Sequence, residues 1–116
     1  MWYDLQNRRH SDDALGAEVR VPTESGWFDG HFPGHPVLPG IAQLAMVFDV
    51  IQGALGVPAR VLEVSRVRFK QMIRPEDRLT VSAEPRPGRP GTYAFRITKG
   101  EEVVCSGTMM VKHLEP

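Results

Sequence analysis

The stretch from Gly40 to Leu55, GIAQLAMVFDVIQGAL, decides the fold of this chain. Apolar residues recur along it at spacings of three and four, the period of an α-helix, at Ile41, Leu44, Phe48, Ile51 and Leu55. Pro39 favours the start of such a helix, and Gly56 favours its end. Most of the remaining positions are apolar as well, so the helix is expected to be buried nearly all round. Three polar residues are expected to reach its surface, Gln43, Asp49 and Gln52.

After this helix, apolar and polar residues alternate with a period of two, which is typical of half-buried β-strands. Four stretches show the alternation, at 66–70, 79–83, 93–97 and 103–111. Segments rich in proline, glycine and charged residues separate them and predict turns between antiparallel strands. One more short strand is predicted before the helix, at 17–21. The expected fold class is therefore α+β, with one long helix packed against one antiparallel sheet.

The composition limits the class of protein. A length of 116 residues predicts a single domain, 1–116. The 14 Lys and Arg balance the 14 Asp and Glu, so there is no electrostatic case for a dedicated nucleic-acid binder. Cys105 is the only cysteine, which excludes an internal disulfide and fits a reducing compartment. Residues 1–10 lack the apolar stretch of a secretory signal, and the apolar region 37–51 is short of the roughly 20 residues that span a bilayer, so we expect a cytoplasmic protein without a membrane partner.

The loop before the helix, from Trp27 to Gly40, holds three prolines and three glycines in fourteen residues and is expected to follow a fixed, irregular path. His31 and His35 stand four residues apart in it, which is the spacing of a helical metal-binding pair. The prolines between and after them exclude the helix that would bring both onto one face, so no metal site is predicted. The residues alone leave two interpretations. In the first, His31 is a functional histidine held at a site; in the second, His31 and His35 are both loop histidines hydrogen-bonded to the backbone.

Residues 30–40, GHFPGHPVLPG, resemble the signature of the 3-hydroxyacyl-acyl-carrier-protein dehydratases of fatty acid synthesis, the FabA/FabZ type, over eleven nearly unbroken positions. Two later stretches, 67–70 and 75–79, are similar to a strand and a turn of the same family, so the similarity spans roughly 19–111. The resemblance implies the hotdog fold, in which an antiparallel β-sheet wraps one long central helix. It also implies a hydro-lyase that converts a 3-hydroxyacyl thioester to a trans-2-enoyl thioester in fatty acid or related lipid or polyketide biosynthesis.

The same resemblance implies the residues of the site. His31 matches the catalytic histidine of the family, and histidine can act as base and acid near neutral pH. Gly40 matches the glycine whose backbone N–H polarises the thioester carbonyl, a use of helix N-terminal donors that is sound in its own right. Three further residues are implied in substrate binding, Phe32, Pro39 and Gln43, and Gln43 fits a structural amide as well. No metal or organic cofactor is expected.

The implied partners are an acyl carrier protein that bears the 3-hydroxyacyl chain and a second copy of this chain, in a homodimer that could assemble further. Between residues 60 and 78, six basic residues stand against three acidic residues, a local charge of six minus three, or +3. An acidic acyl carrier protein fits this stretch, and so does a solvated strand face.

One helix position departs from the family pattern. The family carries a Glu or Asp on the fifth residue after this Pro-Gly, which reaches the histidine of the other subunit across the dimer interface. Counting five from Gly40 reaches Ala45. Asp49, the only acid of the helix, lies one turn later, about 6 Å further along the axis. Asp49 is predicted to be a catalytic residue in place of the missing acid; the other interpretations are a solvent-facing or capping residue and an interface residue.

Two other functions remain open from the sequence. A hotdog acyl thioesterase would use a helix carboxylate such as Asp49 to activate water. A non-catalytic hotdog subunit would bind acyl chains or carrier protein, which Ala45 in place of the acid allows.

Overall fold

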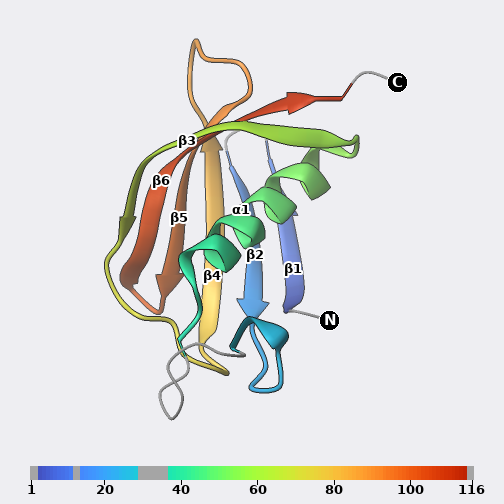
Figure 1. Ribbon diagram of the computed structural model, residues 1–116. Helices are drawn as coiled ribbons and strands as arrows, with labels where there is room; N and C mark the ends of the chain where they lie inside the picture. The colour runs from blue at the N-terminus through green and yellow to red at the C-terminus, as the bar shows by residue number, and fades with distance from the viewer. Residues whose placement is uncertain (1–2, 12–13, 29–36, 115–116) are drawn as a thin grey trace.

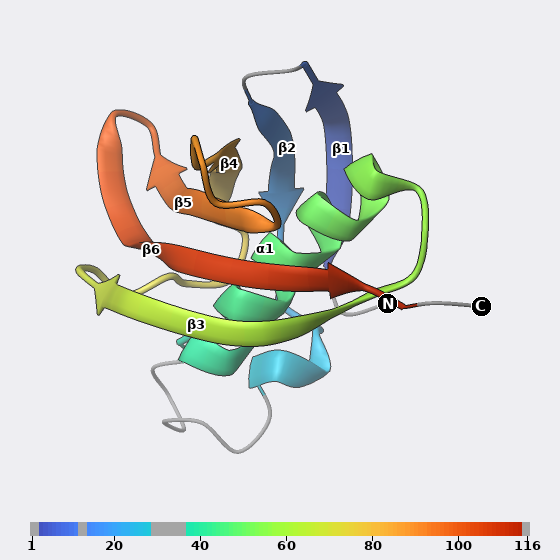
Figure 2. The same cartoon turned by 90° about the horizontal axis from the view of Figure 1, so that it is seen from above.

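A computed structural model describes residues 3–11, 14–28 and 37–114. One long helix, α1 (Gly40–Leu55), lies across one face of a six-stranded antiparallel sheet (Figure 1). Seen from above, the sheet curves around α1 (Figure 2). The predicted α+β class, with one long helix wrapped by an antiparallel sheet, is therefore confirmed.

The strand order across the sheet is β1-β2-β4-β5-β6-β3, and every neighbouring pair is antiparallel. The four strands predicted after the helix are all present: β3 (Ala59–Phe69), β4 (Arg78–Pro85), β5 (Thr92–Lys99) and β6 (Glu102–His113). The last three extend beyond their alternating stretches at both ends, whereas β3 begins seven residues earlier than its stretch and ends one residue before it. The strand predicted before the helix is β2 (Leu15–Arg20), and a short 3₁₀-helix, η1 (Gly26–Phe28), follows it. Strands β1 and β3 form the two edges of the sheet.

Strand β1 (Asp4–His10) is not predicted by the sequence pattern, because its sequence, DLQNRRH, holds a single apolar residue and no alternation. It pairs only with β2, and its residues are half-buried or exposed. The pairing shifts register between Gln6 and Arg9, where Asn7 takes a left-handed φ of 51°. A strand that buries so little has no apolar face to impose a period of two on its sequence.

Helix α1 buries one face against the sheet, formed by Ala42, Gln43, Met46, Val47, Val50 and Ile51. Its other apolar residues stay partly open in the single chain: Ile41 is 66 % exposed, and Leu44, Phe48 and Leu55 are half-buried. The prediction that the helix is buried nearly all round is therefore wrong for one chain, because one sheet covers only one side of it. The prediction that Gln43 reaches the surface is also wrong, since Gln43 is 3 % exposed.

The core lies between this helix face and the inward-facing residues of the strands, among them Leu79, Val81, Phe95, Ile97 and Met109. Residues at alternate positions of β4 and β5 contribute to it, as their period of two predicts. The core thus holds α1 by one side only.

Among the described residues, no helix combines the length and the apolar character that crossing a membrane requires. The cytoplasmic location and the extent of the domain, 1–116, stay predictions.

Candidate active site

The start of α1 is the part of the expected site that the structure describes. Pro39 precedes the helix in an extended conformation, with φ of −68° and ψ of 154°, and Gly40 is the first helical residue. The N–H groups of Ala42 and Gln43 donate to the Pro39 carbonyl oxygen, at 3.1 and 3.3 Å. The N–H groups of Gly40 and Ile41 donate to no described residue. At the positive end of a helix dipole, these two free donors suit an acceptor such as a thioester carbonyl oxygen.

The residue before Pro39 is held on both sides. The N–H of Leu38 donates to the carbonyl oxygen of Ile73 at 2.8 Å, and the Leu38 carbonyl oxygen accepts a hydrogen bond from Gln43 Nε2 at 3.3 Å. Leu38 and Ile73 are both buried. The approach to the helix is therefore fixed by the segment between β3 and β4 and by the helix itself.

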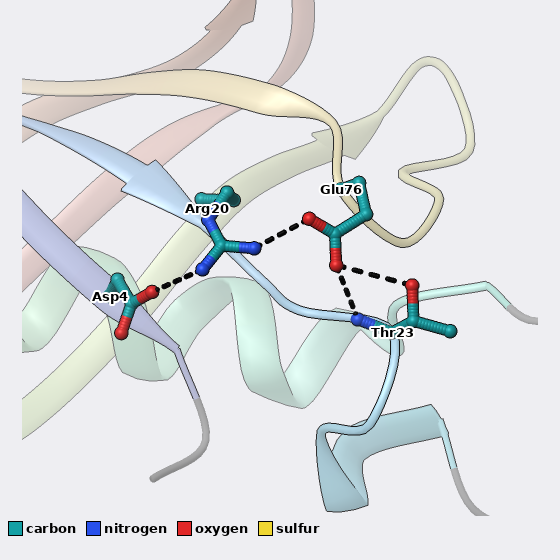
Figure 3. A network of polar contacts seen from close by, with 4 residues as sticks. All are labelled: Asp4, Arg20, Thr23 and Glu76. Atoms are coloured by element: carbon teal, nitrogen blue, oxygen red, sulfur yellow. Dashed lines mark hydrogen bonds and ion pairs between the residues drawn. The ribbon is translucent and has the colours of Figure 1, made fainter.

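A polar network joins the segments around this helix start (Figure 3). Arg20, at the end of β2, forms ion pairs with Asp4 of β1 at 2.7 Å and with Glu76 at 2.5 Å. The other carboxylate oxygen of Glu76 accepts hydrogen bonds from the N–H and the hydroxyl of Thr23, at 2.7 and 3.1 Å. The Thr23 N–H and the Arg20 guanidinium lower the pKa of Glu76, so its carboxylate stays ionised at neutral pH. The network ties the β3–β4 connection to the segment between β2 and η1.

The aromatic ring of Phe69, the last residue of β3, lies against Gly40. A Cβ atom added to Gly40 would stand 2.7 Å from Cζ of that ring and 3.1 and 3.2 Å from its two Cε atoms, which is closer than such atoms pack. Phe69 is nevertheless 52 % exposed, and Ile41 in the first turn of the helix is 66 % exposed. Exposed apolar groups gathered next to free backbone donors suggest a place where a partly apolar ligand enters.

Asp49 lies in the second half of α1, nine residues after Gly40 and so about 13 Å along the helix axis. Its Oδ2 atom accepts a hydrogen bond from the hydroxyl of Tyr3, just before β1. Partial burial raises the pKa of the Asp49 carboxyl. A shallow groove beside it is lined by Arg8, Gln52, Gly53, Gly56, Val57 and Pro58. The described contacts of Asp49 are thus directed to β1 and to the C-terminal half of the helix.

Of the other residues proposed for the site, Gly40, Pro39 and Gln43 gather at the helix start, whereas His31 and Phe32 lie outside the described residues. His35 does so too. Ala45 is half-buried in the second turn of α1. The roles proposed for all of these residues stay predictions.

Sequence reasoning missed Phe69 as a neighbour of Gly40 and Ile73 as the acceptor for Leu38. Phe69 is predicted only as a strand residue, and Ile73 belongs to an irregular segment without a pattern. The glycine at the helix start is the one available signal, because a glycine is expected where another group approaches the backbone closely.

Cys105 is fully buried, and burial raises the pKa of its thiol to about 11. The thiol is therefore protonated at neutral pH and lies in the core as an inert apolar group. Within the described ranges, no three His, Cys, Asp or Glu side chains come together as a group that could hold a metal ion.

A family model described as ApeI-like, ApeI dehydratase, matches residues 7–108 of the chain. The match includes every residue of the helix start discussed above. The chain belongs to the ApeI-like dehydratase family. The predicted membership of a FabA/FabZ-like dehydratase family is confirmed by this match and by the relatives that follow.

Several relatives carry the description 3-hydroxyacyl-[acyl-carrier-protein] dehydratase FabZ, among them the following two. The protein of Syntrophomonas wolfei is 36 % identical over 96 residues, which cover 72 % of this chain and 65 % of that protein. The protein of Clostridioides difficile is 34 % identical over 107 residues, which cover 82 % of this chain and 73 % of that protein. The chain therefore spans less than two thirds of the length of the first of these relatives.

Among solved structures, the dehydratase heterocomplex ApeI:P from Xenorhabdus doucetiae superposes with a TM-score of 0.83 at 21 % identity. The superposition covers 96 % of this chain and 98 % of that chain. At this level of identity the likeness shows the fold, and it confirms the predicted hotdog architecture.

Proposed function

We propose that this chain removes water from a 3-hydroxyacyl thioester carried by an acyl carrier protein and releases the trans-2-enoyl thioester. The observation that carries the proposal is the start of α1 in a member of a dehydratase family. There the free N–H groups of Gly40 and Ile41 stand beside the exposed apolar side chain of Phe69. The thioester carbonyl of the substrate needs hydrogen-bond donors, and its acyl chain needs an apolar surface next to them.

In the proposed reaction, the Gly40 N–H donates a hydrogen bond to the thioester carbonyl oxygen and stabilises the negative charge that develops there. This charge makes the hydrogen on C2 more acidic, and the neutral imidazole of His31 removes that proton. The C3–O bond then breaks, a C2=C3 double bond forms, and the departing hydroxyl takes up a proton to leave as water. His31 returns its proton to the hydroxyl, or Asp49 supplies one; in the second case solvent then takes the proton from His31 and returns a proton to Asp49.

The basic stretch is proposed as the docking surface for the carrier protein. Its six basic residues are all exposed, and none forms an ion pair with a described residue: Arg60, Arg66, Arg68, Lys70, Arg74 and Arg78. Two of them, Arg68 and Lys70, flank Phe69 in the chain, next to the helix start. Unpaired cations around an exposed apolar group suit an acidic partner that delivers an acyl chain.

The proposed activity is tested by incubating the purified protein with a 3-hydroxyacyl thioester of acyl carrier protein while enoyl absorbance and free thiol are followed together. Enoyl absorbance without free thiol supports the dehydratase. Release of thiol without enoyl product would mean a thioesterase instead. Binding of the acyl carrier protein with neither product would mean a non-catalytic subunit.

The half-exposed apolar face of α1 and the free edge of β3 predict a homodimer. Strand β3 has a partner on one side only, and it exposes Val61, Leu62 and Phe69, which are 39, 48 and 52 % exposed. An unpaired edge with apolar side chains is a template for pairing with a second chain. Light scattering should therefore give twice the chain mass of 13.0 kDa at micromolar concentration.

A substitution on that edge makes the dimer prediction specific. We expect Leu62→Asp to shift the protein toward the monomer and to lower activity in parallel, since a buried unpaired charge opposes association. Arg89→Gln, which changes the net charge by the same amount in the β4–β5 turn, should leave the mass unchanged. A monomeric wild type would contradict the homodimer. So would a mass near 13.0 kDa that doubles only when a second hotdog chain, one that carries the helix acid, is added.

For Asp49, we expect Asp49→Asn to slow dehydration at least about tenfold without unfolding the protein. Asparagine keeps an oxygen that can accept the Tyr3 hydrogen bond, but it cannot give up a proton. Because burial raises the pKa of Asp49 in the folded chain, its ionised form disfavours folding, and stability falls as pH rises from about 3.8 through the raised pKa. The Asn variant should therefore be no less stable than wild type at neutral pH.

Ala45→Glu is the companion variant, because it restores an acid at the position where the family carries one. We expect this variant to keep dehydratase activity. Full activity of a folded Asp49→Asn protein would show that His31 acts alone or through water. An inactive wild type that gains activity on Ala45→Glu would support the non-catalytic subunit.

A further inference from the structure

Gln43 is the one polar residue on the buried face of α1. It is 3 % exposed, and its neighbours on that face include Ala42, Met46 and Val47, which are fully buried and apolar. Its Nε2 atom donates to the Leu38 carbonyl oxygen at 3.3 Å, whereas its Oε1 atom is buried without a partner among the described residues. The orientation of the amide is fixed by this contact, because a backbone carbonyl accepts hydrogen bonds and cannot donate one.

A glutamine in this position is costly. A buried amide oxygen without a donor loses the hydrogen bonds that water gave it, and an apolar side chain of the same size would avoid that loss. The part of Gln43 that has a partner is its NH₂ group. What this residue provides, and an apolar residue would not, is therefore a donor to the Leu38 carbonyl oxygen.

That donor completes a clamp on Leu38. The N–H of Leu38 is held by Ile73 at 2.8 Å, and its carbonyl is held by Gln43. The second hydrogen bond fixes the plane of the peptide that joins Leu38 to Pro39. The Pro39 ring limits φ, which is −68°, and the hydrogen bonds from the N–H groups of Ala42 and Gln43 to the Pro39 carbonyl oxygen hold ψ at 154°. The peptide that carries the Gly40 N–H therefore has little freedom left.

We propose that Gln43 is a positioning residue: its side-chain amide holds the Leu38–Pro39 peptide and thereby fixes the direction of the Gly40 N–H. The inference rests on the proposed function, in which that N–H binds the thioester carbonyl oxygen. Gln43 itself needs no contact with the substrate in this role. An oxyanion donor is effective only when it is oriented before the charge develops, and small misplacements of reacting groups have large effects on rate.

Gln43→Met tests the clamp, because methionine has a similar shape and no donor. We expect kcat for dehydration to fall by up to about 10²-fold while KM changes by no more than about twofold, since the lost interaction acts in the transition state. The matched control is Gln52→Met on the same helix. Gln52 also binds the backbone, its Oε1 accepting from the Ala59 N–H at 3.0 Å, but it does so beyond the end of the helix, so kcat should stay at the wild-type value.

Gln43→Glu provides a rescue that a merely structural role would not show. When protonated, the carboxyl of this variant can donate its O–H to the Leu38 carbonyl oxygen; when ionised, it has no donor. Among the described residues, no charged side chain is hydrogen-bonded to Gln43 to complicate this titration. The kcat of the variant, divided by that of wild type at the same pH, should approach one at low pH and fall as pH rises. Circular dichroism at each pH must show folded protein.

The amide resonance of Gly40 separates this inference from the proposed activity. In ¹H–¹⁵N spectra without substrate, Gln43→Met should shift and broaden the Gly40 signal, while Gln52→Met should not. An unchanged Gly40 signal together with wild-type kcat in folded Gln43→Met overturns the inference and leaves the dehydratase intact. If the wild type forms no enoyl product, the proposed function fails, and the Gly40 signal alone decides whether Gln43 positions that amide.

Discussion

His31→Ala is expected to lower the turnover of 3-hydroxyacyl thioester by about 10²–10⁴-fold, the range for loss of a general acid–base group. The reason is chemical: the proposed reaction must take a proton from C2 near neutral pH, and imidazole is the side chain whose ordinary pKa lies there. In the stretch that resembles the family signature, His31 is predicted to be the family's catalytic histidine. Initial rates of enoyl formation, at saturating substrate and with the fold checked by circular dichroism, measure the effect.

His35→Ala is the matched control, four residues further along the same loop. It removes the same type of side chain but not the predicted base, so it should change thermal stability more than turnover. Near-wild-type dehydration by a folded His31→Ala protein would falsify the mechanism, whatever His35→Ala does.

The parts of the fold that can be predicted are those whose burial imposes a period on the sequence. Strands β4 and β5 each place alternate residues in the core, and the same alternation of apolar and polar residues is visible in the amino-acid sequence. Helix α1 is predicted to its first and last residue, because Pro39 and Gly56 border a long apolar stretch. Strand β1 is not predictable, because an exposed edge strand needs only a partner backbone and leaves its side chains free to be polar.

In helix α1, the helical period of the apolar residues does not predict which of its side chains are buried. Its apolar residues surround it nearly completely, yet the sheet buries only one side, and Ile41 is left 66 % exposed. Apolar residues are expected on every side of a helix that is buried, whether by the chain's own sheet or by a second chain. The sequence therefore does not show which apolar side packs against the chain's own sheet. Gln43 shows the reverse of Ile41. A polar residue is expected at the surface, but the Gln43 side chain is buried and donates a hydrogen bond to the Leu38 carbonyl oxygen.

The candidate site is predictable only in part. The roles of Gly40 and His31 stay predictions, and they rest on a contiguous signature that a single sequence displays in full. The contacts that shape the helix start join segments far apart in the chain, such as Phe69 against Gly40 and Ile73 against Leu38. Such pairings depend on sheet register and on an irregular connection, and neither leaves a pattern in one sequence.

Gly40→Ala is expected to lower kcat by about 10²-fold, the lower end of the range for loss of one oxyanion donor. The added methyl carbon would stand 2.7 Å from Cζ of Phe69, so the ring or the first turn of α1 must move, and the Gly40 N–H is displaced or covered. The protein should remain folded, since Phe69 is 52 % exposed and its ring has space to turn outward. Enoyl formation under single-turnover conditions measures the chemical step directly.

Gly53→Ala on the same helix is the control for helix propensity. There the added carbon meets only the guanidinium end of Arg8, an exposed and flexible side chain that can swing away. This variant should keep wild-type kcat and gain up to about 1 kcal/mol of stability, because alanine loses less backbone entropy than glycine in a helix. A loss of activity in Gly53→Ala equal to that in Gly40→Ala would mean that any alanine in this helix disturbs the site, and would remove the case for Gly40.

A double-mutant cycle with Phe69→Ala identifies the cause of the loss. If the collision with the ring displaces the Gly40 N–H, adding Gly40→Ala to Phe69→Ala should cost only a few-fold in kcat, because the ring is no longer there to collide. If the new methyl group itself blocks the thioester carbonyl, the loss of about 10²-fold persists in the Phe69→Ala background. We expect the first result, because the nearest atoms that the structure gives for the added carbon all belong to Phe69. In that case the ring of Phe69 requires a glycine at this position, and the free N–H of Gly40 is what that glycine preserves for the substrate.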